Sequence, residues 1–281
     1  MIPLRRVRSE AAIPRAFRGP ERIENERKLL LDRRRLLKQE ISKQEFDASR
    51  WKSAKEQLLR ESHGKCAYCE APTSVVAFGD VEHYRPKSIY WWLAYNYENY
   101  LASCALCNEK FKKDEFPIKN SSKRLKGPKV TAATTDAKIS TLAGTAGPDS
   151  LVPGQVAAFA TKHAAERPLL LNPYFDVPAQ LLAWRADDNL KTVELVALPN
   201  HPQSKAVVDA AIQFYGLNRQ ELTELRYQQY VTFRTFKQVA AVGTLPNQLQ
   251  TEVANRILQL QDDHSAFAGM LRFFNAQPGF P

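Results

Sequence analysis

Two Cys-x-x-Cys pairs constrain this chain more than any other feature of its 281 residues. They are Cys66 with Cys69 and Cys104 with Cys107, and the sequence contains no further cysteine. Two thiolates three positions apart fit one tight turn, and two such turns complete a tetrahedral zinc site. Four free buried thiols or an iron–sulfur cluster are the alternatives. Because four protein ligands leave no open position, we expect this zinc to shape the fold and not to activate water.

The charge of the chain favours a polyanionic partner. With 40 Lys and Arg against 30 Asp and Glu, the formal net charge is +10, which suits nucleic acid or an acidic protein face. A merely soluble basic protein is the plain alternative. No stretch approaches the roughly 18 apolar residues of a membrane span, and no apolar run follows the basic N-terminus. We therefore expect a cytoplasmic protein outside the membrane, where clustered cysteines bind metal.

Shifts in composition divide the chain into five predicted segments. These are a basic N-terminal arm at 1–19, N-terminal helices at 20–62, a core at 63–118, a flexible insertion at 119–165, and a mainly helical region with a small hairpin at 166–281. The insertion is assigned because large apolar residues are sparse in it, and long loops are usually functional or disordered. The expected fold class is α+β, mostly helical.

Two helices are predicted in the N-terminal segment, at 20–43 and 47–62. In the first, acidic residues precede basic ones, which suits the helix dipole, and apolar residues recur near the helical period. Gly64 is expected to stop the second helix. The arginine run Arg33 to Arg35 is either a solvated helix face or a contact for phosphate or an acidic partner.

The C-terminal region is predicted to begin with a hairpin and continue with helices. Strands at 181–185 and 192–196 flank a polar turn. Helices are then expected at 203–215, 219–240, 246–262 and 264–276. Asn218 is expected to cap the second of these helices at its N-terminus.

The stretch between the cysteine pairs carries the candidate chemistry. Strands are predicted at 75–78 and 81–84, and a helix at 101–112. Glu82 and His83 are consecutive, so an extended chain points them to opposite faces. A distortion at the end of the strand is therefore needed to bring both side chains to one phosphate.

This stretch resembles the zinc-bearing members of the HNH endonuclease family. The shared pattern is Glu82-His83-x-x-Pro86-Lys87, then Asn99, then the second cysteine pair followed directly by Asn108. The resemblance implies a ββα-metal core in which His83 is the general base and Glu82 the acidic metal ligand. Asn108, in place of a histidine, is implied as the second ligand, and Asn99 as the brace of the loop that carries His83.

Elementary chemistry agrees with those roles. Phosphodiester hydrolysis needs an in-line water, a base of near-neutral pKa and a cation at the developing charge, and histidine is the side chain whose pKa lies in that range. A carboxylate and an amide oxygen suit Mg²⁺ or Mn²⁺. A lone histidine in a strand is usually structural, but His83 stands beside an acid and between two zinc turns. The expected cofactors are therefore a structural Zn²⁺ and a catalytic Mg²⁺ or Mn²⁺.

Cations around the motif are predicted to contact nucleic acid. They are Arg85, Lys87, Lys110 and Lys112. The lysine of the family pattern would fall near Phe111, so Lys112 or Lys113 takes its place in the resemblance. Asp80 is interpreted as a turn residue, with a further metal ligand as the alternative.

Other aromatic and histidine side chains are given structural roles. At least two of the three residues Trp91, Trp92 and Tyr95 are expected to pack in the core and not to stack on bases. The histidines outside the motif are interpreted as surface or capping residues: His63, His163, His201 and His264.

Beyond the motif, the chain is similar to the HNH subunits of bacterial anti-phage systems, such as the Septu nuclease subunit and the HNH proteins associated with retrons. The stronger match covers 66–118 and a weaker one 167–275. This resemblance implies a gating ATPase partner of the ABC or SMC-like type, which would dock through the basic arm or the insertion. We expect a nuclease that cuts DNA. A nuclease of the same chemistry acting on RNA such as tRNA, and a non-catalytic zinc module that binds nucleic acid or a partner, are the alternatives.

Overall fold

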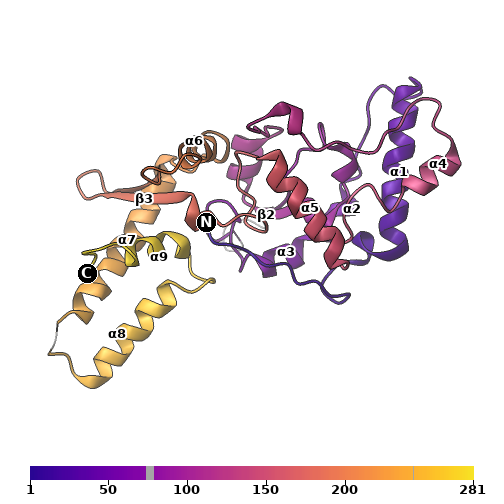
Figure 1. Ribbon diagram of the computed structural model, residues 1–281. Helices are drawn as coiled ribbons and strands as arrows, with labels where there is room; N and C mark the ends of the chain where they lie inside the picture. Colours follow the sequence, from indigo (N-terminus) through magenta and orange to yellow (C-terminus); the bar gives the residue numbers. More distant parts are fainter. Residues whose placement is uncertain (74–78, 243) are drawn as a thin grey trace.

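Helices supply most of the regular structure, and two antiparallel hairpins supply the strands in the part of the chain that is described. This computed structural model describes residues 1–73, 79–242 and 244–281. The N-terminal half and the C-terminal helices lie at opposite ends of an elongated molecule, with the N-terminus between them (Figure 1). The predicted fold class, mixed and mostly helical, is confirmed.

The N-terminal helices are shorter than predicted. They are α1 (Gly19–Leu37), α2 (Ser49–Lys52) and α3 (Lys55–Glu61). The chain leaves α1 before the predicted end at 43 because Gln39 adopts a left-handed conformation, with φ of 62°. The single helix predicted at 47–62 is two short ones, and Gly64, with φ of 70°, follows the second as expected.

The predicted basic arm is packed into the molecule and is not an exposed extension. Met1, Ile2 and Leu4 are buried in the main hydrophobic core. The side chain of Arg6 is buried as well, and its Nη1 lies 3.0 Å from a carboxylate oxygen of Glu61. The guanidinium also lies 3.6 Å from the ring centroid of Tyr174. These acidic and aromatic partners explain how a basic segment can be buried.

The first hairpin pairs β1 (Asp80–His83) with β2 (Tyr100–Ser103), so that Glu82 faces Leu101 and His83 faces Tyr100. The strand predicted at 75–78 lies outside the described residues. The prediction that Leu101 begins a helix is wrong, because β2 is buried along its whole length and supplies the partner of β1. The helical segment that follows is a π-helix, η4 (Leu106–Lys112).

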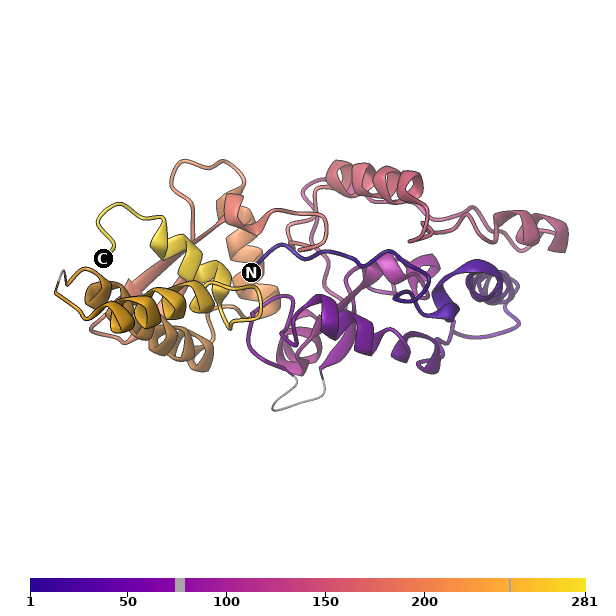
Figure 2. The same cartoon turned by 90° about the horizontal axis from the view of Figure 1, so that it is seen from below.

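The segment 119–165, predicted as a flexible insertion, carries two α-helices. They are α4 (Asp136–Leu142) and α5 (Pro153–Glu166), and Figure 2 shows the segment running along the N-terminal half. The backbone N–H of Gly144 donates to Glu26 of α1 at 2.7 Å, and Arg34 of α1 lies 2.7 Å from Asp136. Polar contacts to α1 therefore order a segment that has few large apolar residues of its own.

The C-terminal region follows its prediction closely. The second hairpin is β3 (Leu182–Asp187) with β4 (Thr192–Ala197), followed by α6 (Ser204–Tyr215), α7 (Gln220–Ala240), α8 (Asn247–Leu260) and α9 (Ala268–Asn275). Only α9 starts late, after Phe267 in a left-handed conformation. Asn218 does not cap α7. Its amide Oδ1 accepts from Leu195 N at 2.8 Å and its Nδ2 donates to Leu195 O at 3.0 Å, which fastens β4.

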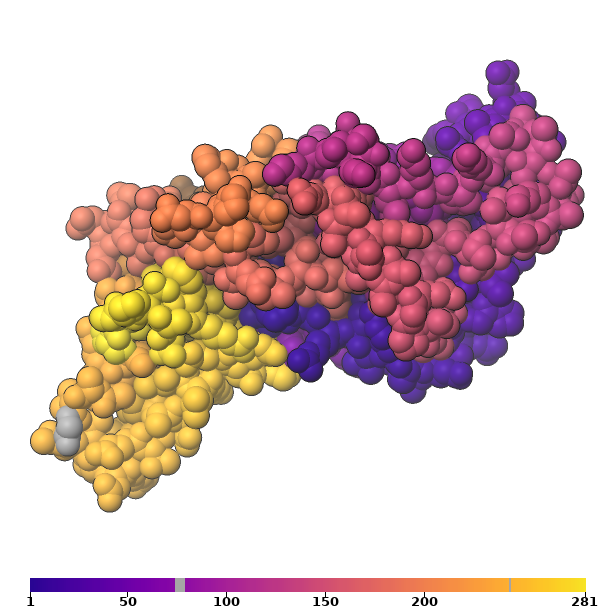
Figure 3. All heavy atoms as spheres, viewed as in Figure 1, coloured from indigo at the N-terminus to yellow at the C-terminus, as the bar shows by residue number. Residues whose placement is uncertain are grey.

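One hydrophobic core joins the two ends of the molecule. It contains the cysteine turns, Leu170 and Leu171, the second hairpin, and the inner faces of α6, α7 and α9. Helices α7 and α8 project from this core at one end of the molecule (Figure 3). Among the residues described, no helix combines the length and apolarity needed to cross a membrane.

Candidate metal centre and active site

The four cysteines converge on one point. The Sγ atoms of Cys66, Cys69, Cys104 and Cys107 all lie within 4.8 Å of one another. Cys69 Sγ and Cys104 Sγ are 4.0 Å apart, close to the separation of about 3.8 Å that follows from Zn–S bonds near 2.3 Å in a tetrahedron. The thiols are free of disulfides. They are therefore close enough together to bind one metal ion such as zinc.

Arginines from the C-terminal region neutralise this cluster. Arg219 Nη1 lies 3.7 Å from Cys107 Sγ. Arg226 is fully buried, and burial lowers its pKa to about 10, although Cys69 and Glu70 oppose that shift. Hydrogen bonds from the other three thiols lower the pKa of Cys69 well below its usual value. Burial raises the pKa of Cys66, and hydrogen bonds from the other thiols raise that of Cys107, so the four thiols are not uniformly favoured as the thiolates that bind a metal.

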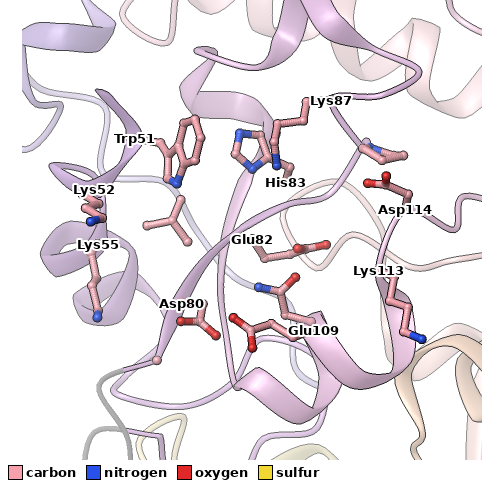
Figure 4. A pocket seen from close by; sticks show the side chains of 14 residues that line it. Trp51, Lys52, Lys55, Asp80, Glu82, His83, Lys87, Glu109, Lys113 and Asp114 are labelled. Carbon is pink, nitrogen blue, oxygen red and sulfur yellow. The ribbon is translucent and has the colours of Figure 1, made fainter. Parts of the chain in front are cut away.

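Glu82, His83 and Asn108 line one open cavity of about 670 Å³. Glu82 and His83 come from the end of β1, and Asn108 from η4. Figure 4 shows Glu82 near the middle of this cavity, with His83 and Lys87 on one side and Lys52 and Lys55 on another. The three residues that the sequence predicts as base and metal ligands therefore share one cavity, although Glu82 and His83 are neighbours in a strand.

Glu82 is held as a buried acid. Its side chain is 4% exposed, and Oε1 lies 2.6 Å from Lys112 Nζ, while the Tyr68 hydroxyl donates to the same oxygen at 3.4 Å. Burial raises the pKa of Glu82, and Lys112 acts in the opposite direction. Lys112 also donates to the carbonyl oxygen of His83 at 3.1 Å. This lysine therefore fixes the end of β1 from beneath the cavity.

The His83 ring is fixed in one tautomer. Its Nε2 lies 2.9 Å from Ala94 O, and a carbonyl oxygen only accepts, so Nε2 carries the proton and Nδ1 has the free lone pair. The rings of Trp51 and Tyr100 meet it edge to face, at centroid distances of 4.9 and 5.1 Å. Burial, and then Lys87, lower its pKa to about 3. The imidazole is therefore neutral with a free lone pair at Nδ1, but its pKa lies well below the near-neutral value expected of a general base.

Asn108 takes its position from the π-helix. Its N–H donates to Cys104 O at 3.0 Å, and its carbonyl accepts from Lys113 N at 2.8 Å, five residues on. Short π-helical turns recur at functional sites. Because Asn108 directly follows Cys107, a shift in the metal-binding turn would move this amide.

Asn99 braces the loop after His83, as the sequence predicts. The residue is fully buried. Its Oδ1 accepts from Arg85 N and its Nδ2 donates to Arg85 O, both at 2.9 Å. The Asn99 side chain therefore satisfies both the backbone N–H and the backbone carbonyl of Arg85, two positions after His83. Asn99 acts through this loop and does not line the cavity.

Arg85 is buried and is not a surface cation, which corrects its prediction as a contact for nucleic acid. It is fully buried, and its Nη2 lies 2.7 Å from Glu166 Oε2 at the end of α5. The same nitrogen lies 3.1 Å from His163 Nδ1, and His163 Nε2 lies 3.2 Å from Asp176. His163 is therefore a buried link in an ionic network and not the surface or capping residue that the sequence predicts.

The other predicted cations separate by position. Lys87 lines the cavity, with its Nζ 5.4 Å from the Trp51 ring centroid. Lys110 is exposed but outside the cavity. Lys112, fully buried against Glu82, is not a surface contact, so that prediction is corrected. Lys113 lines the cavity.

Residues upstream of the motif complete the cavity, and the sequence reasoning missed them. Trp51 and Lys52 of α2, with Lys55 of α3, form one wall. No local pattern links them to a motif about thirty residues later, and only the packing of α3 on both strands brings them there. Asp80, interpreted as a turn residue, lies in β1 and lines the same cavity.

The remaining aromatic and histidine predictions have mixed outcomes. Trp92 and Tyr95 are buried and Trp91 is partly exposed, so two of the three pack in the core as expected. His201 is a capping residue, because its Nδ1 accepts from the backbone N–H groups of Gln203 and Ser204 at the start of α6. His63 and His264 contact each other.

The chain is similar to two curated proteins, both named Septu protein PtuB. The one from Bacillus mycoides (strain KBAB4) is 30% identical over 194 residues, which are 64% of this chain and 52% of that protein. The one from Bacillus thuringiensis is 43% identical over 54 residues, 19% of this chain and 21% of that protein. The chain thus spans about half the length of the first relative and less of the second. No family model matches the chain, and no solved structure matches it.

Proposed function

We propose that this chain is a metal-dependent endonuclease of the HNH type that hydrolyses phosphodiester bonds, with DNA as its substrate. The observation that carries the proposal is the meeting of Glu82, His83 and Asn108 at one open cavity. A base, a carboxylate and an amide oxygen are the groups that a single-metal phosphodiesterase requires. The similarity to Septu proteins supports a role as the nuclease of an anti-phage defence system.

His83 is the general base in this proposal. Its Nδ1 has the free lone pair because Nε2 is bonded to Ala94 O, so Nδ1 accepts a proton from the attacking water. Asn99 holds the loop behind it, and the Trp51 and Tyr100 ring edges limit its rotation. A positioned base of this kind typically contributes about 10²–10⁴-fold to a rate.

Glu82 and Asn108 are the residues that would hold Mg²⁺ or Mn²⁺, since both offer oxygen ligands to the same cavity. The bound cation would stabilise the negative charge that develops on the phosphate. Lys112 keeps the Glu82 carboxylate paired in a buried position. The two protein ligands leave room for water and for a substrate oxygen.

Lysines around the cavity are suited to the backbone of the substrate. Lys52, Lys55, Lys87 and Lys113 all line it. Four acidic residues line the cavity as well, namely Asp80, Glu82, Glu109 and Asp114, so the preference for a polyanion rests on the net charge of +10 of the whole chain, because contacts to phosphates supply most of the non-specific affinity for nucleic acid. We further propose that an ATPase of the ABC or SMC-like type gates the nuclease in the cell. That step rests on the resemblance to anti-phage systems.

The test compares cleavage by wild type, His83→Ala and His201→Ala. Each protein is assayed alone and with the co-purified ATPase, on supercoiled plasmid and on total RNA, with Mg²⁺, Mn²⁺ or Ca²⁺. We expect Mg²⁺- or Mn²⁺-dependent nicking of plasmid that falls at least about 10²-fold in His83→Ala and persists in His201→Ala, whose histidine caps α6.

Three results would count against the proposal. Cleavage by His83→Ala at the wild-type rate would rule out His83 as the general base. Cleavage of total RNA but not of plasmid would show that the substrate is RNA and not DNA. Binding of nucleic acid without cleavage in any mixture would identify a non-catalytic zinc module.

A further inference from the structure

Two histidines far apart in the sequence meet at the junction of the two ends of the molecule. His63 follows α3, and His264 lies in the turn between α8 and α9. His63 Nδ1 is 3.3 Å from His264 Nε2, and the ring centroids are 4.3 Å apart. Neither residue lines the cavity of the proposed nuclease site or belongs to the cysteine cluster.

The backbone on both sides of the pair is fixed. His63 has a left-handed conformation, with φ of 56°, and its N–H donates to Arg60 O at 3.1 Å. In the opposite turn, the His264 N–H donates to Asp262 Oδ1 at 2.8 Å. Lys65 Nζ donates to Ser265 O at 2.8 Å, which ties the two segments together. The two rings are therefore presented to each other by ordered turns.

A carboxylate orients the exposed ring. His264 Nδ1 lies 2.7 Å from Asp262 Oδ1, so Nδ1 carries the proton and Nε2, on the side of His63, has the free lone pair. Metal-binding histidines usually donate their second N–H in this way. Burial, and then the neighbouring His264, lower the pKa of His63, which keeps that imidazole in the neutral form that binds metals.

The spacing of the two nitrogens fits a shared metal ion. With Zn–N bonds of about 2.0–2.1 Å, two ligands of one tetrahedral zinc lie about 3.3 Å apart, and the observed separation is 3.3 Å. We propose that His63 Nδ1 and His264 Nε2 form a second divalent-metal site, of the zinc class, that bridges the end of α3 and the turn before α9. The His264 side chain is 75% exposed, so water can complete the coordination shell.

This second site differs in purpose from the cysteine cluster. Two protein ligands hold zinc more weakly than four thiolates, so occupancy follows the free zinc concentration. An ion that binds only the folded chain stabilises it by RT ln(1 + [L]/Kd). The site therefore strengthens the junction between the N-terminal half and the C-terminal helices when zinc is available.

The experiment titrates Zn²⁺ by calorimetry into the full chain, after its zinc content has been measured. We expect one further zinc to bind to wild type and to His201→Ala. His264→Ala and His63→Asn should lose it, and asparagine is used at 63 because it tolerates a left-handed backbone. Asp262→Asn should weaken zinc binding by about 10–100-fold, because the carboxylate that orients the His264 ring loses its charge. The amide oxygen can still accept from the His264 backbone N–H, so the turn itself is kept.

A thermal melt gives the second readout. Excess Zn²⁺ should raise the unfolding midpoint of wild type and of His201→Ala, and leave that of His264→Ala unchanged. The proposal is overturned if wild type binds no further zinc, which would leave a hydrogen-bonded histidine pair. It is also overturned if the further zinc persists in both histidine variants.

Discussion

The cysteine cluster and the cavity share one segment of the chain but are built in opposite ways. Four thiols, largely buried, surround a closed point, and a closed four-ligand site shapes the chain without reacting. The cavity beside it is open, and its walls come from α2, α3, β1, the loop after it and η4. Both sites join residues that lie far apart in the sequence, but the cysteine pairs announce themselves by their spacing, whereas the wall from α2 and α3 carries no such pattern.

The boundary between the two sites falls between consecutive residues. Cys107 belongs to the cluster and Asn108 to the cavity. The π-helix that contains both is held by the bond from Lys113 N to Asn108 O. Metal in the cluster should therefore set the direction of the Asn108 amide without taking part in the reaction.

Removing the cluster metal should give the largest effect. Structural zinc sites contribute apparent free energies on the order of 10–16 kcal/mol in small domains, and the cysteines here lie within the main core. A strong chelator should therefore unfold the chain and abolish cleavage together. Circular dichroism alongside a colorimetric zinc assay measures this. A chain that keeps its native spectrum after losing its zinc would show that the cluster does not shape the fold.

Breaking the buried ion pair behind the cavity should cost less but still be large. Glu166→Gln leaves the Arg85 charge buried without its partner, and both side chains are fully buried. Loss of one partner of such a pair costs about 3–5 kcal/mol. Denaturant unfolding measures this, with Glu194→Gln as the matched control, because Glu194 pairs with Arg185 at the surface and should change stability by about 0–1 kcal/mol. Equal effects of the two substitutions would refute the structural role of Arg85.

Removing one cation from the cavity wall should give the smallest effect. Lys87→Ala should weaken binding to duplex DNA at all sequences and lower the slope of log affinity against log salt by about 0.9. Binding is measured in a His83→Ala background over a range of KCl concentrations. Lys110→Ala, an exposed lysine outside the cavity, is the control. A larger loss of affinity in Lys110→Ala than in Lys87→Ala would indicate that the nucleic acid binds along the exposed face of η4.

Local patterns predicted much of the fold and part of the site. Cysteine spacing predicted the cluster, and periodicity predicted the second hairpin and helices α6 to α8. Glu82, His83 and Asn108 were expected together and line one cavity. The hairpin, the helices and each cysteine turn lie within the short range that sequence patterns report, whereas the grouping of Glu82, His83 and Asn108 came from the resemblance to the HNH family.

The errors have one physical cause. Arg85 and Lys87 look alike in the sequence, but Glu166, far along the chain, buries the first and leaves the second at the cavity. Residues 101–103, predicted to begin a helix, belong instead to β2 and pair with β1 for the same reason. Long-range partners decide burial, and a single sequence does not reveal them.

The central claim is that the cluster shapes and the cavity reacts, and the neighbouring substitutions Asn108→Ala and Cys107→Ala test it most directly. Cleavage rate, zinc content and unfolding midpoint are measured on both proteins. Asn108→Ala should keep the zinc content and unfolding midpoint of wild type and lose cleavage. Cys107→Ala should lose both zinc and cleavage and unfold at a lower midpoint. Cleavage by Asn108→Ala at the wild-type rate, or by Cys107→Ala without zinc, would contradict the account.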